Sequence, residues 1–380
     1  MSKDDKTYRI FISAAEASAD AHCAGLIRAL KKSNSNIEFV GVGGSKMAEA
    51  GCKILHKTVT KAAMAYKAFG QVVHFYKLIK RISRYIKTNK PDLVIVCDSP
   101  AFNFHVAKAA KKAGAKTLFY VAPQLWAWAP WRIGKLKKRC DKLCCILPFE
   151  QDWFGERGLD TVFVGHPMLD ELSAVLTGRK KTYKKFDPKN AHLALMPGSR
   201  TAEINSLWEP MQQIAVALKR SYPNITITTA AINAASREAL RSMQIIGFRC
   251  EYAIDSVAET ARAADLSLVA SGSATLQVAA AGCPMVIMYQ SSPILWHLLG
   301  RWLVKMKYFS LVNILADKEL VPEFMPFFTS TEPILQRCRQ LLTDTDKLKQ
   351  TSGRLVELVS SLQTDTASQK TAQIALDMLT

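Results

Sequence analysis

The chain has 380 residues, of which 49% are hydrophobic, and this is enough for two α/β domains of about 150–200 residues each. Its 51 Lys and Arg exceed its 32 Asp and Glu, giving a formal charge of +19, so we expect an anionic partner: nucleic acid, anionic lipid or a phosphorylated substrate. The polar start and the lack of a long apolar run argue against a signal peptide and a transmembrane helix, so a cytoplasmic protein is expected.

The first 171 residues alternate between strand and helix patterns, which predicts an N-terminal Rossmann-like lobe with a parallel sheet covered on both faces. The predicted strands are 9–13, 37–42, 93–97, 116–121, 142–146 and 161–164, and the predicted helices are 19–32, 69–87 and 106–112.

Polar residues follow the first of these strands. Glu16, Ser18 and Asp20 lie in the turn between strand and helix, at the carboxyl edge of the predicted sheet. Helix capping by Ser18 or Asp20 competes with substrate binding as an explanation for each residue. The position at the sheet edge favours function for the group.

Asp98 ends another buried strand, and Pro100 keeps it out of a regular helical turn. A carboxylate there is suited to accept a proton from a hydroxyl group. The alternative is an aspartate that binds its own loop amides. The next strand leads to a loop with Trp126, Trp128 and Trp131, which is either a wall for a sugar or acyl-bearing ligand or a set of buried anchors.

Two segments, 69–87 and 295–306, carry apolar residues at helical spacing together with Lys and Arg. Such a helix either packs in a core or lies on an anionic bilayer, and the sequence leaves both open. The nine cysteines form no CxxC pair, so we expect reduced, structural thiols and no metal site, including at Cys140, Cys144 and Cys145.

A lysine-rich, apolar-poor segment, 172–190, predicts an exposed connection between two lobes. Beyond it, 191–350 is expected to form a second Rossmann-like lobe, and 351–380 a C-terminal helical segment whose lobe stays open. The predicted strands of this part are 192–196, 224–229, 265–270 and 285–289, and the predicted helices are 208–221, 237–243 and 274–281.

Two turns in the second lobe predict an anion site. Pro197-Gly-Ser-Arg200 breaks an apolar strand just before a helix, which places helix N–H groups beside a permanent cation. Ser271-Gly-Ser273 makes a similar turn about 70 residues later. Neighbouring strands of one parallel sheet would bring the two turns to one crevice, which indicates a nucleotide site.

Together these segments resemble the lipid-A-disaccharide synthases, a family of bacterial glycosyltransferases of the two-lobed GT-B type. The resemblance spans nearly the whole chain and rests on the shared order of Glu16-Ala-Ser18 with Asp20, Gly41-Val-Gly-Gly44, Asp98-x-Pro100 with Asn103, Tyr120-Val-x-Pro123 with Trp126, Leu147-Pro-Phe-Glu150, Gly165-His166, Pro197-Gly-Ser-Arg200 with Glu203, Ser271-Gly272, Cys283-Pro-Met-Val286, and Ser310-Leu311 with Asn313.

The resemblance implies a GT-B fold with an active site between two lobes, and inverting transfer from UDP-2,3-diacylglucosamine to 2,3-diacylglucosamine 1-phosphate. It implies Asp98 as the catalytic base and Arg200 as the catalytic group at the leaving diphosphate. The implied substrate-binding residues are Glu16, Ser18, Asn103, Trp126, Ser199, Glu203, Ser271, Gly272, Ser273, Gln277 and Asn313. No metal and no cofactor is expected, because such enzymes are usually metal-independent.

The basic surface suits an enzyme held peripherally at the anionic inner face of the cytoplasmic membrane. The sequence leaves open whether the protein is a monomer or a homodimer. Four positions depart from the family pattern: Ala15 and Ala19 replace glycines, Ala101 replaces an aspartate, and Gln277 replaces a glutamate that commonly binds ribose. Because of the change at Gln277, a transferase that uses another UDP-sugar stays a possible function. The alternative that is not an enzyme is a non-catalytic relative that binds nucleotide or lipid. Nucleic-acid binding explains the charge but not the paired turns, so no nucleic acid is expected.

Overall fold

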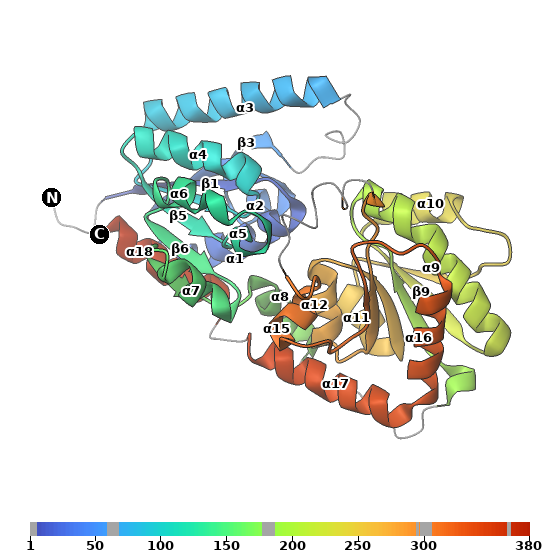
Figure 1. Cartoon of the computed structure of the whole chain (residues 1–380). Helices are drawn as coiled ribbons and strands as arrows, with labels where there is room; N and C mark the ends of the chain where they lie inside the picture. The colour runs from blue at the N-terminus through green and yellow to red at the C-terminus, as the bar shows by residue number, and fades with distance from the viewer. Residues whose placement is uncertain (1–5, 59–67, 177–186, 294–295, 297–305, 363–365) are drawn as a thin grey trace. The chain divides into compact units, whose positions relative to one another are not determined.

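The computed structural model describes residues 6–58, 68–176, 187–293, 296, 306–362 and 366–380. The chain divides into two compact units (Figure 1). Unit 1 comprises Met1–Asp170 and Leu362–Thr380, and unit 2 comprises Glu171–Ser361. The connection expected over 172–190 and the basic segment expected over 295–306 lie largely outside the described residues.

Unit 1 is built on a parallel sheet with the strand order β3-β2-β1-β4-β5-β6-β7. Its strands are β1 (Tyr8–Ala14), β2 (Ile37–Gly43), β3 (Lys53–Lys57), β4 (Leu93–Cys97), β5 (Lys116–Tyr120), β6 (Lys142–Cys145) and β7 (Thr161–Phe163). Its helices are α1 (Ala17–Ser33), α2 (Ser45–Glu49), α3 (Ala68–Asn89), α4 (Pro100–Lys112), α5 (Leu125–Trp128), η3 (Pro130–Arg132), α6 (Ile133–Lys137), α7 (Pro148–Gly155) and α18 (Ala367–Leu379), and α8 (Pro167–Leu176) leads into unit 2.

Helices cover both faces of this sheet, with α3 and α4 packed together on one face and α1 beside α18 on the other. In α3 the residues Leu78, Ile82 and Ile86 are buried in the same core as Phe11 and Phe119. The Lys and Arg residues of α3 between 77 and 87 are exposed. The helix therefore packs in the core with one face and presents a basic face to solvent.

The C-terminal helix belongs to unit 1, although it follows unit 2 in sequence. The Asp170 carboxylate accepts hydrogen bonds from the backbone N–H groups of Ala367 (3.0 Å) and Ser368 (2.9 Å), the first two residues of α18. Helix α17 runs through residue 350, where the sequence suggested a boundary, and stays in unit 2.

Unit 2 is built on a second parallel sheet with the order β10-β9-β8-β11-β12-β13. Its strands are β8 (His192–Met196), β9 (Thr226–Ala231), β10 (Glu251–Ile254), β11 (Leu266–Ala270), β12 (Met285–Met288) and β13 (Glu323–Phe324). Its helices are η4 (Pro188–Asn190), α9 (Thr201–Ser221), α10 (Ala234–Ser242), α11 (Val257–Ala263), α12 (Ser273–Ala280), α15 (Leu311–Ala316), α16 (Glu332–Thr343) and α17 (Thr345–Ser360).

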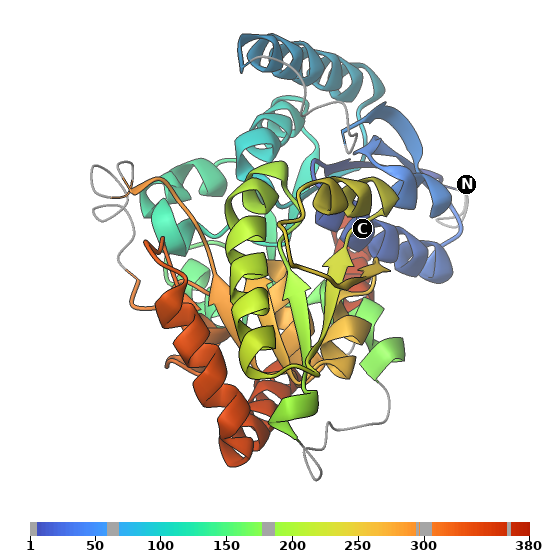
Figure 2. The same cartoon turned by 90° about the vertical axis from the view of Figure 1, so that its right-hand side faces the viewer.

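Figure 2 shows α9 and α16 over one face of the unit 2 sheet, while α11 and α12 pack together on the other. Trp208 of α9 is fully buried in this core. The predicted doubly wound fold is confirmed, and β4 and β8 coincide with the expected strands. The strands that sequence analysis missed, β3, β10 and β13, are short sheet edges without a continuous buried apolar run.

Candidate active site

In unit 1 the loops after β1 and β4 lie side by side at the carboxyl edge of the sheet. These strands are neighbours, with Ala14 paired to Cys97, and the strand order reverses between them. Ligands of doubly wound sheets bind at such a reversal. Glu16 is exposed, Asp98 is half-buried, and the Ser99 hydroxyl donates a hydrogen bond to Glu16 Oε1 at 3.2 Å. The structure therefore brings Glu16 and Asp98, expected to share a site, to adjoining loops.

The turn that carries Asp98 has an unusual backbone. Asp98 and Ser99 adopt φ angles of 50° and 42°, in the left-handed region that non-glycine residues rarely occupy. The buried side chain of Asn103 donates hydrogen bonds to the carbonyl groups of Cys97 and Asp98, both at 2.8 Å. This corrects the expectation for Asn103: its amide donors are used inside the protein, so it has none left for a substrate.

The Glu16-to-Asp20 segment divides into an exposed part and a structural part. Ser18 is exposed, whereas Asp20 is 3% exposed and accepts backbone hydrogen bonds from Gly44 (2.7 Å), Lys46 (3.1 Å) and Met47 (3.2 Å). Asp20 therefore holds the start of α2 and does not cap its own helix. Ala15 and Ala19 need no glycine, because neither has a positive φ.

Trp126 is anchored by a carboxyl group that sequence analysis did not single out as a site residue. Its indole Nε1 donates to Glu150 Oε1 at 2.9 Å, and its ring meets Phe149 edge-on with centroids 4.9 Å apart. Glu150 is fully buried and also accepts the backbone N–H groups of Ile146 and Leu147, both at 3.1 Å. Glutamate at the third position of a helix that begins with proline is a capping signal that was available in the sequence.

Burial raises the pKa of Glu150 to about 7, although its three hydrogen bonds act in the opposite direction. The negative charge of Asp98 contributes to the rise in pKa. The other two tryptophans of this loop are more open: Trp128 is 39% exposed and Trp131 is 61% exposed. The Arg132 guanidinium lies 5.1 Å from the centroid of the Trp128 ring.

In unit 2 the predicted neighbouring turns are confirmed, because β8 pairs with β11 where the strand order reverses. Gly198 has a φ of 103°, and a Cβ there would lie 2.5 Å from Glu203 Oε2. Glu203 accepts the backbone N–H groups of Ser199 (2.9 Å) and Arg200 (3.1 Å), and its Oε1 pairs with the Arg200 guanidinium at 3.1 Å.

These contacts show what holds the backbone N–H groups of Ser199 and Arg200, just before the helix whose first N–H groups were predicted to bind an anion. Glu203 occupies both of them as part of a capping box, so its carboxylate fixes the turn. The Arg200 side chain is still 63% exposed at the carboxyl edge of the sheet. Within this turn, the guanidinium is the group that reaches solvent as a cation.

The turn after β11 is the more open of the two. Ser271 is half-buried, and Gly272 and Ser273 are exposed. Gly272 has a φ of 155°, and the Thr275 hydroxyl donates to its carbonyl at 2.7 Å. Helix α12 begins at Ser273, and Gln277 lies half-buried one turn later. The N-terminal end of α12, with its partial positive charge, thus faces the carboxyl edge.

The buried side chain of Asn313 holds the loop that leads into β13. Its amide nitrogen donates to the Val321 carbonyl (2.8 Å) and to Glu323 (2.9 Å), and its oxygen accepts from the backbone of Leu320 (2.9 Å) and Val321 (3.1 Å). All four hydrogen-bonding positions of the buried amide are filled. The expected direct donor contact is therefore corrected, because Asn313 has no hydrogen-bonding group left over.

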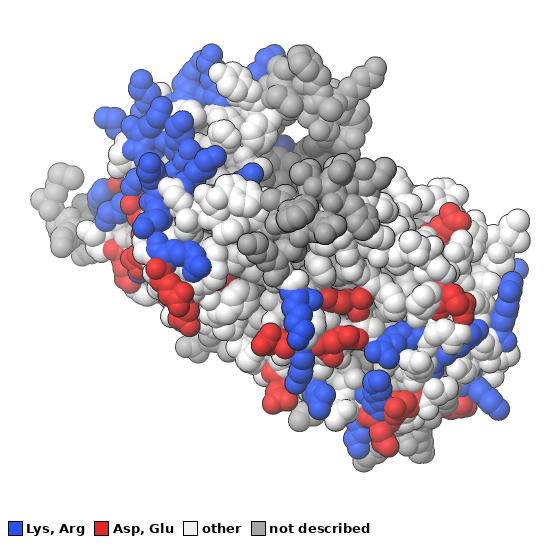
Figure 3. Space-filling view, viewed as in Figure 1, with Lys and Arg blue, Asp and Glu red and all other residues white. Residues whose placement is uncertain are grey.

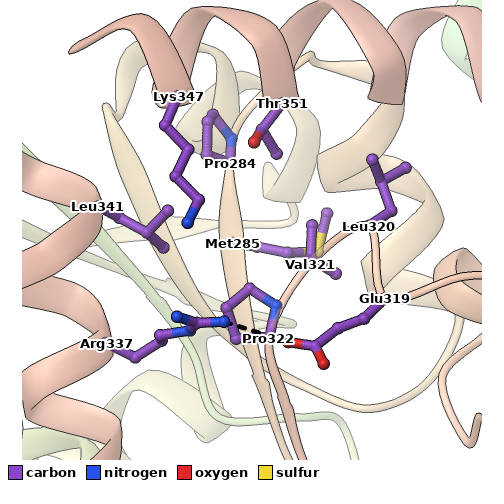
Figure 4. A pocket seen from close by; sticks show the side chains of 10 residues that line it. All are labelled: Pro284, Met285, Glu319, Leu320, Val321, Pro322, Arg337, Leu341, Lys347 and Thr351. Atoms are coloured by element: carbon purple, nitrogen blue, oxygen red, sulfur yellow. Dashed lines mark hydrogen bonds and ion pairs between the residues drawn. The ribbon is translucent and has the colours of Figure 1, made fainter. Parts of the chain in front are cut away.

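A pocket lies at the opposite, amino edge of the unit 2 sheet (Figure 4), and its volume is about 120 Å³. Met285, Val321 and Leu341 form its apolar wall, and an ion pair between Arg337 and Glu319 (3.3 Å) lies at its rim. The predicted site residues do not line this pocket. In the part of the chain that the structure describes, no cluster of three or more His, Cys, Asp or Glu side chains is arranged to hold a metal ion.

The family model described as lipid-A-disaccharide synthetase matches residues 10–378 of this chain. Curated relatives named lipid-A-disaccharide synthase include that of Glaesserella parasuis, 34% identical with 97% of each chain covered. The relative from Trichlorobacter lovleyi is 33% identical, with 98% of this chain and 97% of the relative covered. The relative from Geobacter metallireducens is 32% identical at the same coverage.

Solved structures with low sequence identity share the fold. A putative UDP-N-acetylglucosamine 2-epimerase from Listeria monocytogenes gives a TM-score of 0.67 at 13% identity, covering 98% of this chain and 97% of that one. The calicheamicin glycosyltransferase CalG4 gives a TM-score of 0.59 at 14% identity, with 98% of both chains covered. The fold is therefore the GT-B fold of glycosyltransferases and these epimerases.

Proposed function

The chain belongs to the lipid-A-disaccharide synthetase family, and we propose which of its residues perform the family's reaction. The enzyme joins UDP-2,3-diacylglucosamine and 2,3-diacylglucosamine 1-phosphate into the β-1,6-linked disaccharide phosphate and releases UDP. The family match over residues 10–378 carries this assignment. The two proposed catalytic residues, Asp98 and Arg200, follow β4 and β8, each at the strand-order reversal of its sheet.

Asp98 is the proposed general base. Its carboxylate accepts the proton of the acceptor 6-hydroxyl, and the hydroxyl oxygen attacks the anomeric carbon of the donor from the face opposite UDP. The new C–O bond forms as the bond from the anomeric carbon to the diphosphate breaks, so the configuration inverts. The half-buried position of Asp98 supports this role. Partial shielding from water strengthens the interaction of the carboxylate with the proton that it accepts, and the exposed part leaves room for the acceptor hydroxyl.

Arg200 is proposed to stabilise the negative charge that develops on the departing diphosphate. The hydroxyl groups of Ser199, Ser271 and Ser273 are proposed to bind the same phosphates. Gly272 precedes α12, whose N-terminal end also faces them. Gln277 is proposed to bind a ribose hydroxyl through its amide, without the charge assistance of the family glutamate. Glu16, Ser18 and Trp126 are proposed to shape the acceptor side in unit 1.

Replacement of Asp98 by alanine tests the base. We expect turnover to fall by about 10²–10⁴-fold, the usual contribution of a positioned acid–base group, while UDP binding measured by calorimetry is unchanged. Turnover close to the wild-type rate would refute the role of Asp98.

Replacement of Arg200 by alanine tests the diphosphate contact. The affinity for UDP should fall by about tenfold to a hundredfold, since hydrogen bonds to charged groups contribute about 1.5–3 kcal/mol. Arg200→Lys keeps the charge but loses the planar fork and should recover only part of the affinity. Unchanged UDP affinity in the alanine variant would count against this contact.

We further propose that the anionic surface of the cytoplasmic membrane is a partner. No described helix combines the length and the apolar character that crossing a bilayer requires. Figure 3 shows Lys and Arg side chains gathered over the part of unit 1 that carries α3 and α4. A basic face of this kind supports peripheral binding, which brings the enzyme to its acylated substrates.

A further inference from the structure

The peptide units on either side of Asp98 are held by one side chain. The carbonyl of Cys97 belongs to the peptide unit before Asp98, and the carbonyl of Asp98 belongs to the unit after it. Both accept a hydrogen bond from the Asn103 amide nitrogen at 2.8 Å. Because these two planes set φ and ψ of Asp98, they also fix the direction of its Cα–Cβ bond.

That conformation requires external support. Asp98 and Ser99 are consecutive residues with positive φ, and their side chains disfavour this backbone region. The next strand end repeats the feature, because Val121 has a φ of 63°. The backbone N–H of Asp98 donates to the Tyr120 carbonyl at 3.1 Å and joins the two strand ends. Strained backbone that persists in a fold is held by its surroundings, and it gathers at functional sites.

Ser13 sets the orientation of the Asn103 amide. Its hydroxyl, on the neighbouring strand β1, donates to Asn103 Oδ1 at 2.7 Å, and both residues are fully buried. A flipped amide would turn its oxygen toward two carbonyl oxygens and leave the Ser13 hydroxyl facing an amino group. The observed orientation satisfies every partner, so the network has one favourable state.

We propose that Asn103, oriented by Ser13, is a positioning residue that fixes the direction in which the Asp98 carboxylate reaches the acceptor hydroxyl. The inference rests on the proposed role of Asp98 as the base. The inference assigns a function to Ser13, which belongs to none of the motifs quoted above. Asn103 acts on the substrate indirectly, through Asp98.

Two variants test the proposal by steady-state kinetics on the full chain. Asn103→Asp keeps the shape but replaces both donors by an acceptor, and kcat should fall by about a hundredfold, the effect of misplacing a reacting group by about 1 Å. Ser13→Ala removes one hydroxyl, and kcat should fall about fivefold, equivalent to one net hydrogen bond. The KM for the UDP-sugar should stay unchanged in both variants, because the donor contacts proposed above lie in unit 2.

Thr371→Val is the matched control, because it removes another fully buried hydroxyl of unit 1, on α18, without changing the shape of the side chain. Thermal melts establish that each variant is folded at the assay temperature. If Asn103→Asp does not fold, Ser13→Ala decides. The proposal is overturned if a folded variant keeps the wild-type kcat or if the Thr371 control loses as much kcat. It is also overturned if only KM changes.

These outcomes are separable from a failure of the proposed function. If the Asp98→Ala variant is active, Asp98 is not the base, and the proposed function of this residue fails. Inactive Asp98→Ala together with fully active Ser13→Ala and Asn103→Asp would leave the base in place and refute only the positioning network.

Discussion

Buried and half-buried polar side chains hold the turns that present the candidate active-site groups. Asn103 fixes the turn of Asp98, and Glu203 fixes the turn of Arg200. Turns between strand and helix leave backbone groups without regular partners, and a side chain that satisfies them also fixes the geometry. Substitutions at Asn103 and Glu203 should therefore alter catalysis by changing the positions of Asp98 and Arg200.

Glu150 gives the protein a specific pH dependence. Its pKa is about 7 in the folded protein against 4.5 for an ordinary glutamate, so the folded state binds the proton more tightly than the unfolded chain. The free energy of unfolding should therefore decrease as the pH rises from about 5 to 8. Relative to Glu150→Gln, which does not titrate, the wild-type protein should lose about 2 kcal/mol over this range.

Urea unfolding of both proteins at several pH values measures the effect. Glu209→Gln, at an exposed position of α9, shows what the same substitution does away from the buried site. A constant difference in stability between wild type and Glu150→Gln across the range would show that the carboxyl group does not titrate there.

Among the helices, α18 has a distinctive position, because it returns from unit 2 to pack beside α1 of unit 1. Two backbone hydrogen bonds to Asp170 fix its N-terminal end. Lys370 adds a bond from its ammonium group to the Phe163 carbonyl at 2.6 Å. The last helix thus completes the fold of the first unit.

Asp170→Ala should destabilise unit 1 by about 1–2 kcal/mol, the usual effect of removing an N-terminal cap. Limited proteolysis should then release the C-terminal segment faster than in the wild type, because α18 loses its anchor. Asp344→Ala is the matched control, since Asp344 caps α17 of unit 2 by accepting the Lys347 N–H at 2.9 Å. Equal release of the segment from both variants would contradict a specific role for Asp170.

At the scale of the molecule, positive charge is concentrated in one part of unit 1. Residues 75–145 contain 16 Lys and Arg but only 3 Asp and Glu. Many of these cations are exposed on α3, α4 and α6, including Lys80, Arg84, Lys108 and Lys135. Charges of one sign on neighbouring helices reinforce one another at an anionic surface.

Charge reversal on α3 tests this surface. The double variant Lys80→Glu with Arg84→Glu should bind vesicles of anionic phospholipid at least about tenfold more weakly, because each basic residue near such a surface contributes about 1 kcal/mol. The control reverses Lys219 and Arg220, exposed cations of α9 in unit 2. Flotation with the vesicles measures binding, and equal losses in both double variants would show that net charge alone is responsible.

Sequence patterns alone predict the fold class and the positions of the strands that carry the site. Short apolar runs such as Leu93–Cys97 and 193–196, alternating with helix patterns, predict buried parallel strands, and polar residues after them lie at the carboxyl edge. The order of motifs also identified the family, which the match over residues 10–378 confirmed.

Contacts in the folded chain were needed to distinguish the polar residues that face outward from those that hold loops. Asn103 and Asn313 belong to family motifs just as Asp98 and Arg200 do. Their side chains, however, form hydrogen bonds with residues distant in sequence or at the far end of a loop. Ser13 and Glu150 gained their significance in the same way. A buried polar group must find its partners in three dimensions, and sequence spacing does not encode those partners.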